Sequence, residues 1–338
     1  MCCHTGYWSL PCLRAPRCFP SAKIGHGVRS IADAEPAPAA GLARCAIVGG
    51  DGAVGRLFAG ALAHAGSALT LLDLAPRPLP GLPPATYVAL DARIPSPALH
   101  DALAEVDCAV LALPEQAALD ALPHVLEALP AGALLVDTLS VKTPFARAAL
   151  AAAAPVELLS LNPMFAPSLG FAGHAVLAVE LAPGARAAAL LRLLRGWARS
   201  VATVPDAAAH DRLTAALQVA PHASVLSFAL ALRDLDVELD ALLAIAPPPF
   251  LALLALLARI GDASPATYAE IQRENPFGAQ ARAALAGGLA QLDAAAGDPD
   301  PQRGEALIAQ AGALLGPHRQ ALAAQAAELL ARVEPPRA

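Results

Sequence analysis

Short apolar runs alternate with longer segments of helical periodicity between residues 44 and 204. Runs of this kind predict buried strands, and the segments between them predict amphipathic helices. Strands and helices that alternate along a chain are typical of an α/β fold with a doubly wound, mainly parallel sheet of the Rossmann type. We predict strands at 44–48, 68–72, 107–113, 133–138, 158–161, 175–180 and 200–204, and helices at 56–65, 116–129, 144–152 and 185–199.

From His210 the strand signals disappear, and the pattern is helical to about Val333. This change predicts a second, all-α domain, with turn-rich interruptions at 287–297 and 312–316 where glycines gather. The boundaries that follow are an α/β domain at 44–205, a helical domain at 206–333 and a short tail at 334–338.

Two stretches of the helical domain, 213–232 and 241–258, carry no charged residue and approach the length of a membrane span. The first contains Gln218, Pro221 and His222, and the second is broken by three consecutive prolines at 247–249. Such residues are unusual in a free-standing span. We therefore expect no membrane association and predict helices that are buried in the interface of an oligomer.

Composition narrows the class of protein. The 338 residues have a net charge of −6, and 15% are charged, against roughly 25% in typical soluble domains. With 56% hydrophobic residues the chain is not disordered, and the lack of a basic stripe argues against nucleic-acid binding. Lys, Asn and Met occur only twice each, so Lys142, Asn162 and Met164 stand out.

Residues 1–43 differ from the rest, with four of the six cysteines, at 2, 3, 12 and 18, and no acidic residue before Asp33. The alternatives are a zinc site, a targeting peptide and a disordered leader that precedes the true start. Paired cysteine spacing and a continuous apolar core are both lacking, which favours the leader. Cys45 and Cys108 lie in predicted strands, and buried thiols favour a reducing cytoplasm.

A glycine-rich turn links the first predicted strand to the first predicted helix. Gly50, Gly52 and Gly55 match the fingerprint GxGxxG, in which backbone amides of the turn and of the following Ala53 and Val54 approach a pyrophosphate. The alternative is a glycine-rich turn that binds no ligand. In this context the motif predicts that residues 44–205 form a dinucleotide-binding domain.

Asp73 ends the second predicted strand, about twenty residues beyond the glycines. A carboxylate at this position binds the ribose hydroxyls and repels a 2′-phosphate, which favours NAD over NADP. Arg77 could bind a 2′-phosphate, so NADP stays an alternative. We expect Leu113 and Pro114, at the end of the third predicted strand, to belong to the same cofactor site.

Three loops should meet at the carboxyl edge of the sheet, at 113–116, 137–142 and 161–167. Ligands bind at this edge in doubly wound folds. Two of the loops carry Lys142, Asn162 and Met164, so the rare residues fall where a site is expected.

Several motifs resemble those of the prephenate/arogenate dehydrogenases of tyrosine biosynthesis, in order, from about Arg44 to Leu330. The resemblance implies a helical substrate domain that dimerises, and a cytoplasmic homodimer that acts with NAD on a cyclohexadienyl carboxylate. In the family reaction, hydride leaves the ring carbon that bears the 4-hydroxyl and the ring carboxylate departs as CO2. The motifs are 49–58, 136–142, 162–167, His210-Asp211 with Gln218 and Pro221-His222, and 268–271 with Asn275.

Two positions depart from the family pattern. The resemblance places Asn162 where the family has a His that acts as the base at the hydroxyl, and Leu251 where it has an Arg that binds a substrate carboxylate. Arg259 is the nearest replacement for that Arg. Because an amide does not accept a proton, loss of the base should cost roughly 10²–10⁴ in rate where one is needed.

The remaining site assignments also follow from the resemblance. His210 with Asp211 fits a helix start as well as a catalytic role, and His174 is a candidate substitute base. We expect no metal. The expected catalytic residues are Ser140, Asn162, His222 and Lys142, and the expected substrate-binding residues are Ser140, Asn162, Gln218, His222 and Arg259.

The main hypothesis is oxidative decarboxylation of prephenate or arogenate by an enzyme with an altered active site. One alternative is a related substrate such as 4-amino-4-deoxyprephenate, because an amide can hydrogen-bond an amine without acting as a base. Another is an inactive nucleotide-binding homologue. A β-hydroxyacid-type dehydrogenase ranks last, since it would need a catalytic Lys in the helical domain and no Lys follows Lys142.

Overall fold

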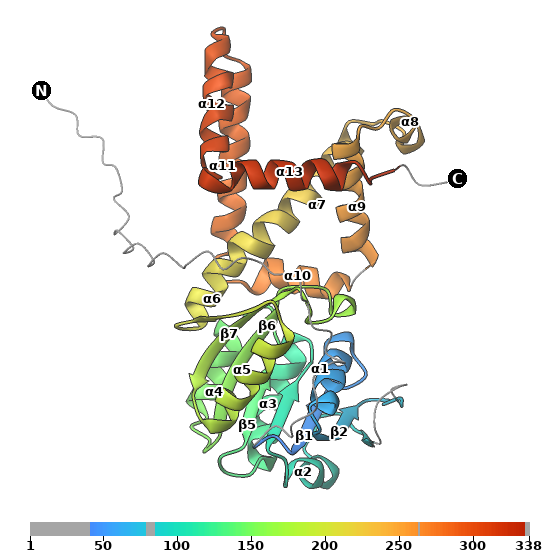
Figure 1. Ribbon diagram of the computed structural model, residues 1–338, viewed down its shortest axis with the longest axis vertical. Helices are drawn as coiled ribbons and strands as arrows, with labels where there is room; N and C mark the ends of the chain where they lie inside the picture. The colour runs from blue at the N-terminus through green and yellow to red at the C-terminus, as the bar shows by residue number, and fades with distance from the viewer. Residues whose placement is uncertain (1–40, 79–84, 263, 335–338) are drawn as a thin grey trace, which may run out of the picture.

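The computed structural model describes residues 41–78, 85–262 and 264–334, and shows a sheet flanked by helices with a helical part above it (Figure 1). Most of the predicted leader, residues 1–40, and positions 335–338 of the predicted tail lie outside the described residues. Leu42 is fully buried and its carbonyl accepts a hydrogen bond from Ser67 Oγ, so the packed core includes a residue of the predicted leader.

The sheet has eight strands in the order β3-β2-β1-β4-β5-β6-β7-β8. All neighbours are parallel except β6 and β7, which are antiparallel. This confirms the predicted doubly wound, mainly parallel fold. The strands are β1 (Arg44–Val48), β2 (Ala68–Asp73), β3 (Thr86–Ala89), β4 (Cys108–Leu111), β5 (Leu134–Asp137), β6 (Glu157–Pro163), β7 (Ala175–Ala182) and β8 (Ser200–Val204).

Two hydrophobic clusters cover the sheet. One contains Phe58 of α1 (Ala53–His64) and Leu190 of α5 (Ala185–Trp197), and the other contains Leu99 of α2 (Pro97–Leu103), Val125 of α3 (Glu115–Ala128) and Phe145 of α4 (Thr143–Ala151). The central strands are buried along their whole length, as the short apolar runs predict. Cys45 and Cys108 are register partners on β1 and β4, and both thiols are free and buried.

Two elements were not predicted. Strand β3 lies at the edge of the sheet and is only partly buried, so its four residues lack a continuous apolar pattern. Helix α2 is short, but the Ser96-Pro97 pair that begins it is a recognisable signal. Ser96 Oγ accepts a hydrogen bond from Leu99 N, and proline is well tolerated in the first turn.

The helical part begins with one unbroken helix, Ala207–Asp234. It comprises α6 (Ala207–Thr214), a π-helical segment (Ala215–Val219) and α7 (Ala220–Asp234). Asp206 caps it, because Asp206 Oδ1 accepts a hydrogen bond from Ala209 N at 2.7 Å. The other helices are α8 (Leu239–Leu243), α9 (Pro248–Asp262), α10 (Pro265–Glu274), α11 (Gly278–Ala296), α12 (Pro301–Ala313) and α13 (Arg319–Leu330).

The predicted interruption at 287–297 is wrong for most of its length. Helix α11 continues through Gly287 and Gly288 to Ala296. Each glycine costs only about 1 kcal/mol relative to alanine, and α11 gains support by packing against α12, its neighbour in the upright pair of Figure 1. The second predicted interruption is confirmed, because α12 ends at Ala313 and Gly316 has a positive φ of 49°.

By length and composition, Ala207–Asp234 is the one unbroken helix in the described part of the chain that could cross a membrane. Its first turns pack on the sheet domain and bury His210 and Asp211 completely. Further along, most of its apolar length is exposed in the single chain, including Leu213, Leu217 and Leu230. The burial predicted for this helix is therefore not supplied by the chain itself.

Candidate active site

The glycine-rich turn after β1 has a backbone path that side chains would block. Gly49 has a φ of +84°, and a Cβ at Gly49 would overlap the carbonyl oxygen of Ala112. A Cβ at Gly55 would overlap the carbonyl oxygen of Gly49, so the third glycine lets α1 approach the turn closely. Helix α1 begins directly after Gly52, with Ala53 and Val54 in its first turn. The amides in the first turn of a helix have no partner within the helix, and such a terminus is suited to bind an anion.

Beside this turn lies a cavity of about 500 Å³. It is lined by several residues that the sequence assigned to a cofactor, namely Gly52, Asp73, Leu113 and Pro114. Asp73 Oδ2 accepts a hydrogen bond from Asp51 N at 2.9 Å, which ties the end of β2 to the glycine turn. The narrow turn, the open helix terminus and the acidic wall together fit a dinucleotide.

Arg77 does not face the cavity as a free cation. Its guanidinium pairs with Asp51 Oδ2 at 2.7 Å, and Arg56 binds the other oxygen of the same carboxylate. The Arg77 hydrogen bond lowers the pKa of the Asp51 carboxyl. Arg77 is therefore already paired. Asp51, Asp73 and Asp91 all line the cavity, and of these Asp51 and Asp91 form ion pairs with arginines.

A buried ion pair stands under the carboxyl ends of β5 and β6. Lys142 is fully buried, and its Nζ lies 2.6 Å from Asp137 Oδ1 and 2.7 Å from the carbonyl oxygen of Leu161. Ser160 Oγ donates to the other oxygen of Asp137. Burial lowers the pKa of Lys142, and Asp137 opposes that shift. The geometry gives Lys142 a supporting position behind the loops, with none of its surface exposed.

Asn162 lies on β6 and is 2% exposed. Its Nδ2 is 3.2 Å from Nε2 of His210, which comes from α6. His210 Nδ1 in turn is 2.9 Å from Asp211 Oδ1. His210 lies inside the helix that starts at Ala207, so the helix-start role considered for it belongs to Asp206 instead.

Asp211 joins the helical part to the sheet. Its two carboxylate oxygens accept hydrogen bonds from the backbone amides of Lys142 at 2.8 Å and Thr143 at 2.9 Å. Burial opposes ionisation of Asp211, but the hydrogen bonds from His210 and from these amides outweigh it and lower the pKa of the carboxyl. Burial also lowers the pKa of His210, which keeps its ring neutral.

Asn275 completes this junction. Its Nδ2 donates to the carbonyl oxygen of Asp211 at 2.9 Å, and its Oδ1 accepts from Phe277 N at 2.8 Å. The structure thus brings together Asn162, His210-Asp211 and Asn275, which lie in three of the motifs noted in the sequence.

A second polar group lies further along the long helix. Gln218 Oε1 and His222 Nδ1 are fully buried and have no hydrogen-bond partner among the residues that the structure describes. The His222 ring lies 4.7 Å from the ring of Tyr268, edge to face. Burial lowers the pKa of His222, and the charge of Arg259 on α9 lowers it further. Buried polar atoms without partners are costly, so this group is suited to bind a polar ligand.

Leu251 is on α9 and only 5% exposed, so the position matched to the family Arg holds a buried apolar side chain. Arg259, on the same helix, is exposed.

Ser140 is half-buried between β5 and α4, and its hydroxyl makes no hydrogen bond within the described part of the chain. His174 is occupied elsewhere, because its Nδ1 lies 3.1 Å from the carbonyl oxygen of Gly170 and its ring packs on Phe165.

Glu115 was not singled out by the sequence. It opens α3, in one of the three loops at the edge of the sheet, and its side chain is buried without a hydrogen-bond partner among the described residues. Burial, together with the charges of Glu274 and Glu270 on α10, raises its pKa to about 7. Its place in the 113–116 loop was the available signal, but its raised pKa depends in part on the charges of α10, which is distant in sequence.

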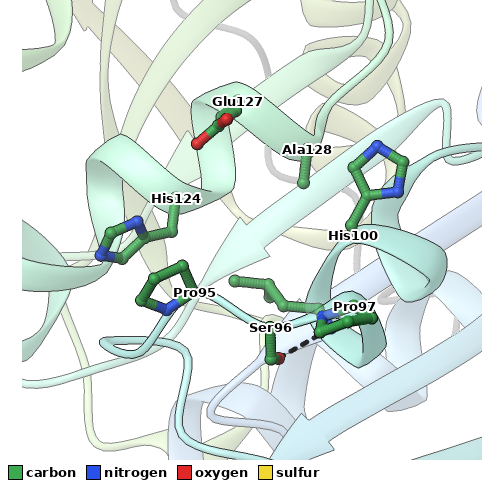
Figure 2. Close-up of a pocket in the computed structure, with 8 residues that line it drawn as sticks. Pro95, Ser96, Pro97, His100, His124, Glu127 and Ala128 are labelled. Carbon is green, nitrogen blue, oxygen red and sulfur yellow. Dashed lines mark hydrogen bonds between the residues drawn. The ribbon is translucent and has the colours of Figure 1, made fainter.

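Another hollow, of about 340 Å³, lies between α2 and α3 (Figure 2). His100, His124 and Glu127 border it, together with Pro95 and Pro97. None of the predicted site residues lies there. Within the ranges that the structure describes, no group of three or more His, Cys, Asp or Glu side chains is placed to hold a metal ion.

Comparisons with known proteins give the chain its family. No family model matches it. It is 45% identical over 278 residues to 4-amino-4-deoxyprephenate dehydrogenase of Streptomyces pristinaespiralis, which covers 81% of this chain and 92% of that protein. Prephenate dehydrogenase of A. aeolicus, solved with hydroxyphenyl propionate and NAD+, matches with a TM-score of 0.60 at 16% identity, over 85% of this chain and 98% of its own.

Arogenate dehydrogenase of Synechocystis shares the same fold, with a TM-score of 0.58 at 17% identity over 79% of this chain and 96% of its own. The structural matches support the fold, and the sequence match covers nearly the whole of its relative. The chain belongs to the prephenate dehydrogenase family of oxidoreductases.

Proposed function

We propose that this protein is an NAD-dependent dehydrogenase that oxidises and decarboxylates 4-amino-4-deoxyprephenate. The observation that carries the proposal is Asn162, which stands where the family resemblance calls for a basic His and which is held by His210 inside the site. The 45% identical relative from Streptomyces, which has this activity by name, supports the same substrate. Of the hypotheses raised by the sequence, the comparisons favour this alternative over prephenate or arogenate.

The amide of Asn162 can support oxidation of a substrate with an amine at C4 better than oxidation of one with a hydroxyl at C4. As hydride leaves C4, the lone pair of a neutral amine forms a C=N bond, and the resulting iminium is far more stable than a protonated carbonyl. Loss of CO2 from C1 then returns an electron pair to the ring and gives a neutral arylamine. A hydrogen bond from the substrate N–H to the Asn162 oxygen is sufficient for this step. Oxidation of a hydroxyl substrate, in contrast, is faster when a base takes the hydroxyl proton.

The cofactor site supports NAD. Gly50, Gly52 and Gly55 let the chain approach a pyrophosphate, and the amides at the start of α1 can bind it. Asp73 would bind the ribose hydroxyls, while Arg77 is engaged by Asp51 and is not free to bind a 2′-phosphate. When bound, NAD accepts the hydride from the substrate.

The substrate carboxylates need donors. We assign them to His222, whose buried Nδ1 lacks a partner among the described residues, and to Arg259, which supplies charge near it. The unpartnered atom of Gln218 is the acceptor Oε1, so Gln218 would bind a carboxylate through its Nε2 donor. Ser140 lies in the loop between Asp137 and Lys142, and its hydroxyl makes no hydrogen bond to the described residues, so it can bind the C4 substituent or the nicotinamide side.

We also propose a cytoplasmic homodimer that forms through the helical domain. Leucines on the long helix and on α11, at 213, 217, 230, 289 and 292, are exposed in the single chain. Burial of such side chains contributes about 25 cal/mol per Å² of apolar surface, which favours a second copy over solvent. Sedimentation should give twice the mass of the chain, and a stable monomer would contradict this assembly.

The experiment that tests the function is NAD reduction, followed as NADH formation, with 4-amino-4-deoxyprephenate, prephenate and arogenate in parallel. We expect kcat/KM for the 4-amino substrate to exceed the other two by at least about tenfold. Comparable turnover of prephenate would instead support the hypothesis that the protein acts in tyrosine synthesis. NAD binding with no turnover of any of the three would identify an inactive homologue.

A further inference from the structure

The amide of Asn162 has two nearly isosteric ends, a donor and an acceptor. Its orientation decides which end a ligand meets, and β6 alone does not fix it. The neighbour that does so is His210, whose Nε2 lies 3.2 Å from the amide. His210 is fully buried and does not touch solvent.

The hydrogen bonds of His210 define which ring nitrogen carries the proton. Asp211 is ionised and only accepts, so the His210 Nδ1 that lies 2.9 Å away donates to it. Asp211 cannot turn away, because its oxygens also accept the backbone amides of Lys142 and Thr143. In a neutral ring with a proton on Nδ1, Nε2 is an acceptor. The end of Asn162 that faces His210 must therefore be the Nδ2 donor.

The other end of the amide is left for a ligand. Asn162 Oδ1 has no hydrogen-bond partner among the described residues, and it is not one of the fully enclosed atoms that lack partners. The chain from Asp211 through His210 to Asn162 thus presents an oxygen acceptor at the position of the family base.

We propose that His210 and Asp211 are positioning residues that hold the Asn162 amide with its oxygen toward the substrate, and so select an amine at C4. The inference rests on the proposed function and adds the residues that create the preference. If the amide turned over, its N–H group would face the amine and oppose the positive charge that develops on nitrogen during hydride loss. A hydroxyl substrate lacks a base in either orientation and is affected less.

The test is the ratio of kcat/KM for 4-amino-4-deoxyprephenate to kcat/KM for prephenate. His210→Phe keeps a ring but removes both hydrogen bonds, and it should lower this ratio about 10-fold to 100-fold, through the amino substrate. His210→Gln supplies a donor and an acceptor again, and it should restore most of the ratio. Because the ratio is independent of the fraction of folded enzyme, partial misfolding does not obscure the result.

Thr214→Val is the matched control. Thr214 is buried on the same helix, and its hydroxyl is hydrogen-bonded to Asn275 and to the backbone carbonyl of Asp211. Among the described residues it makes no hydrogen bond to the side chains of Asn162, His210 or Asp211. We expect its ratio to equal that of the wild type, even if stability falls. Equal loss of both activities in His210→Phe, with an unchanged ratio, would overturn the positioning role. A wild-type enzyme with no preference for the amino substrate would instead overturn the proposed function.

Discussion

Lys142 Nζ lies 2.6 Å from Asp137 Oδ1, and both side chains are sealed from solvent beneath the loops of the active site. Two charges in such a place stabilise the fold only while both are present. Removal of one partner leaves an uncompensated buried charge, which typically costs about 3–5 kcal/mol.

Lys142→Met should therefore lower the free energy of unfolding by about 3–5 kcal/mol, measured by urea denaturation. Arg93→Gln is the control, because it breaks an exposed pair of similar length, 2.7 Å, with Asp91 and should cost under about 1 kcal/mol. A Lys142→Met enzyme that unfolds like the control but loses turnover would show that Lys142 acts on the substrate instead.

Glu115 makes stability depend on pH. Its pKa of about 7 in the folded protein lies above the ordinary value of 4.5, so the folded state holds the proton more tightly than the unfolded state. The contribution is fully present below about pH 4.5 and is lost as pH rises through 7. The groups around it are Glu270 and Glu274 on α10, Asp211 and Lys142.

Glu115→Gln should be more stable than the wild type at pH 8 by roughly 1–3 kcal/mol, and the difference should disappear near pH 4.5. Paired urea titrations at several pH values measure it. A difference that is constant with pH would mean that Glu115 does not titrate in this range.

Two glycines of α1 should respond in opposite directions to the same substitution. At Gly55 a Cβ would overlap the turn backbone, so Gly55→Ala should distort the turn and weaken NAD binding at least about tenfold. At Gly60 nothing lies within 4 Å, so Gly60→Ala should raise stability by up to about 1 kcal/mol and leave the NAD Kd unchanged. Calorimetric titration with NAD, together with denaturation, checks both predictions. An NAD Kd for Gly55→Ala equal to that of the wild type would show that the glycine turn is not part of the cofactor site.

The parts of the fold that local chemistry encodes could be predicted from the sequence. Glycines reveal the turn before α1, and the apolar runs reveal the buried strands. Edge strand β3 lacks such a run, and the packing that carries α11 through Gly287 and Gly288 has no local signal.

For the candidate site too, the sequence predicts some features, and other features depend on long-range packing. The rarity of Asn162 and the family motifs located it on the sequence. Its contact with His210 joins residues 48 positions apart, and Asp211 reaches Lys142 across 69 positions. No local pattern specifies how α6 and α10 pack on the end of the sheet. That packing determines these pairings, the buried position of Lys142 and the raised pKa of Glu115.

The most direct measurement compares the wild type with Asn162→His on 4-amino-4-deoxyprephenate and prephenate. We predict that the wild type prefers the amino substrate, and that Asn162→His raises kcat/KM on prephenate by about 10²-fold or more, because a ring nitrogen then accepts the hydroxyl proton. The preference should shift toward the hydroxyl substrate. If Asn162→His leaves prephenate turnover unchanged and the wild type does not distinguish the two substrates, Asn162 is not the residue that selects between them.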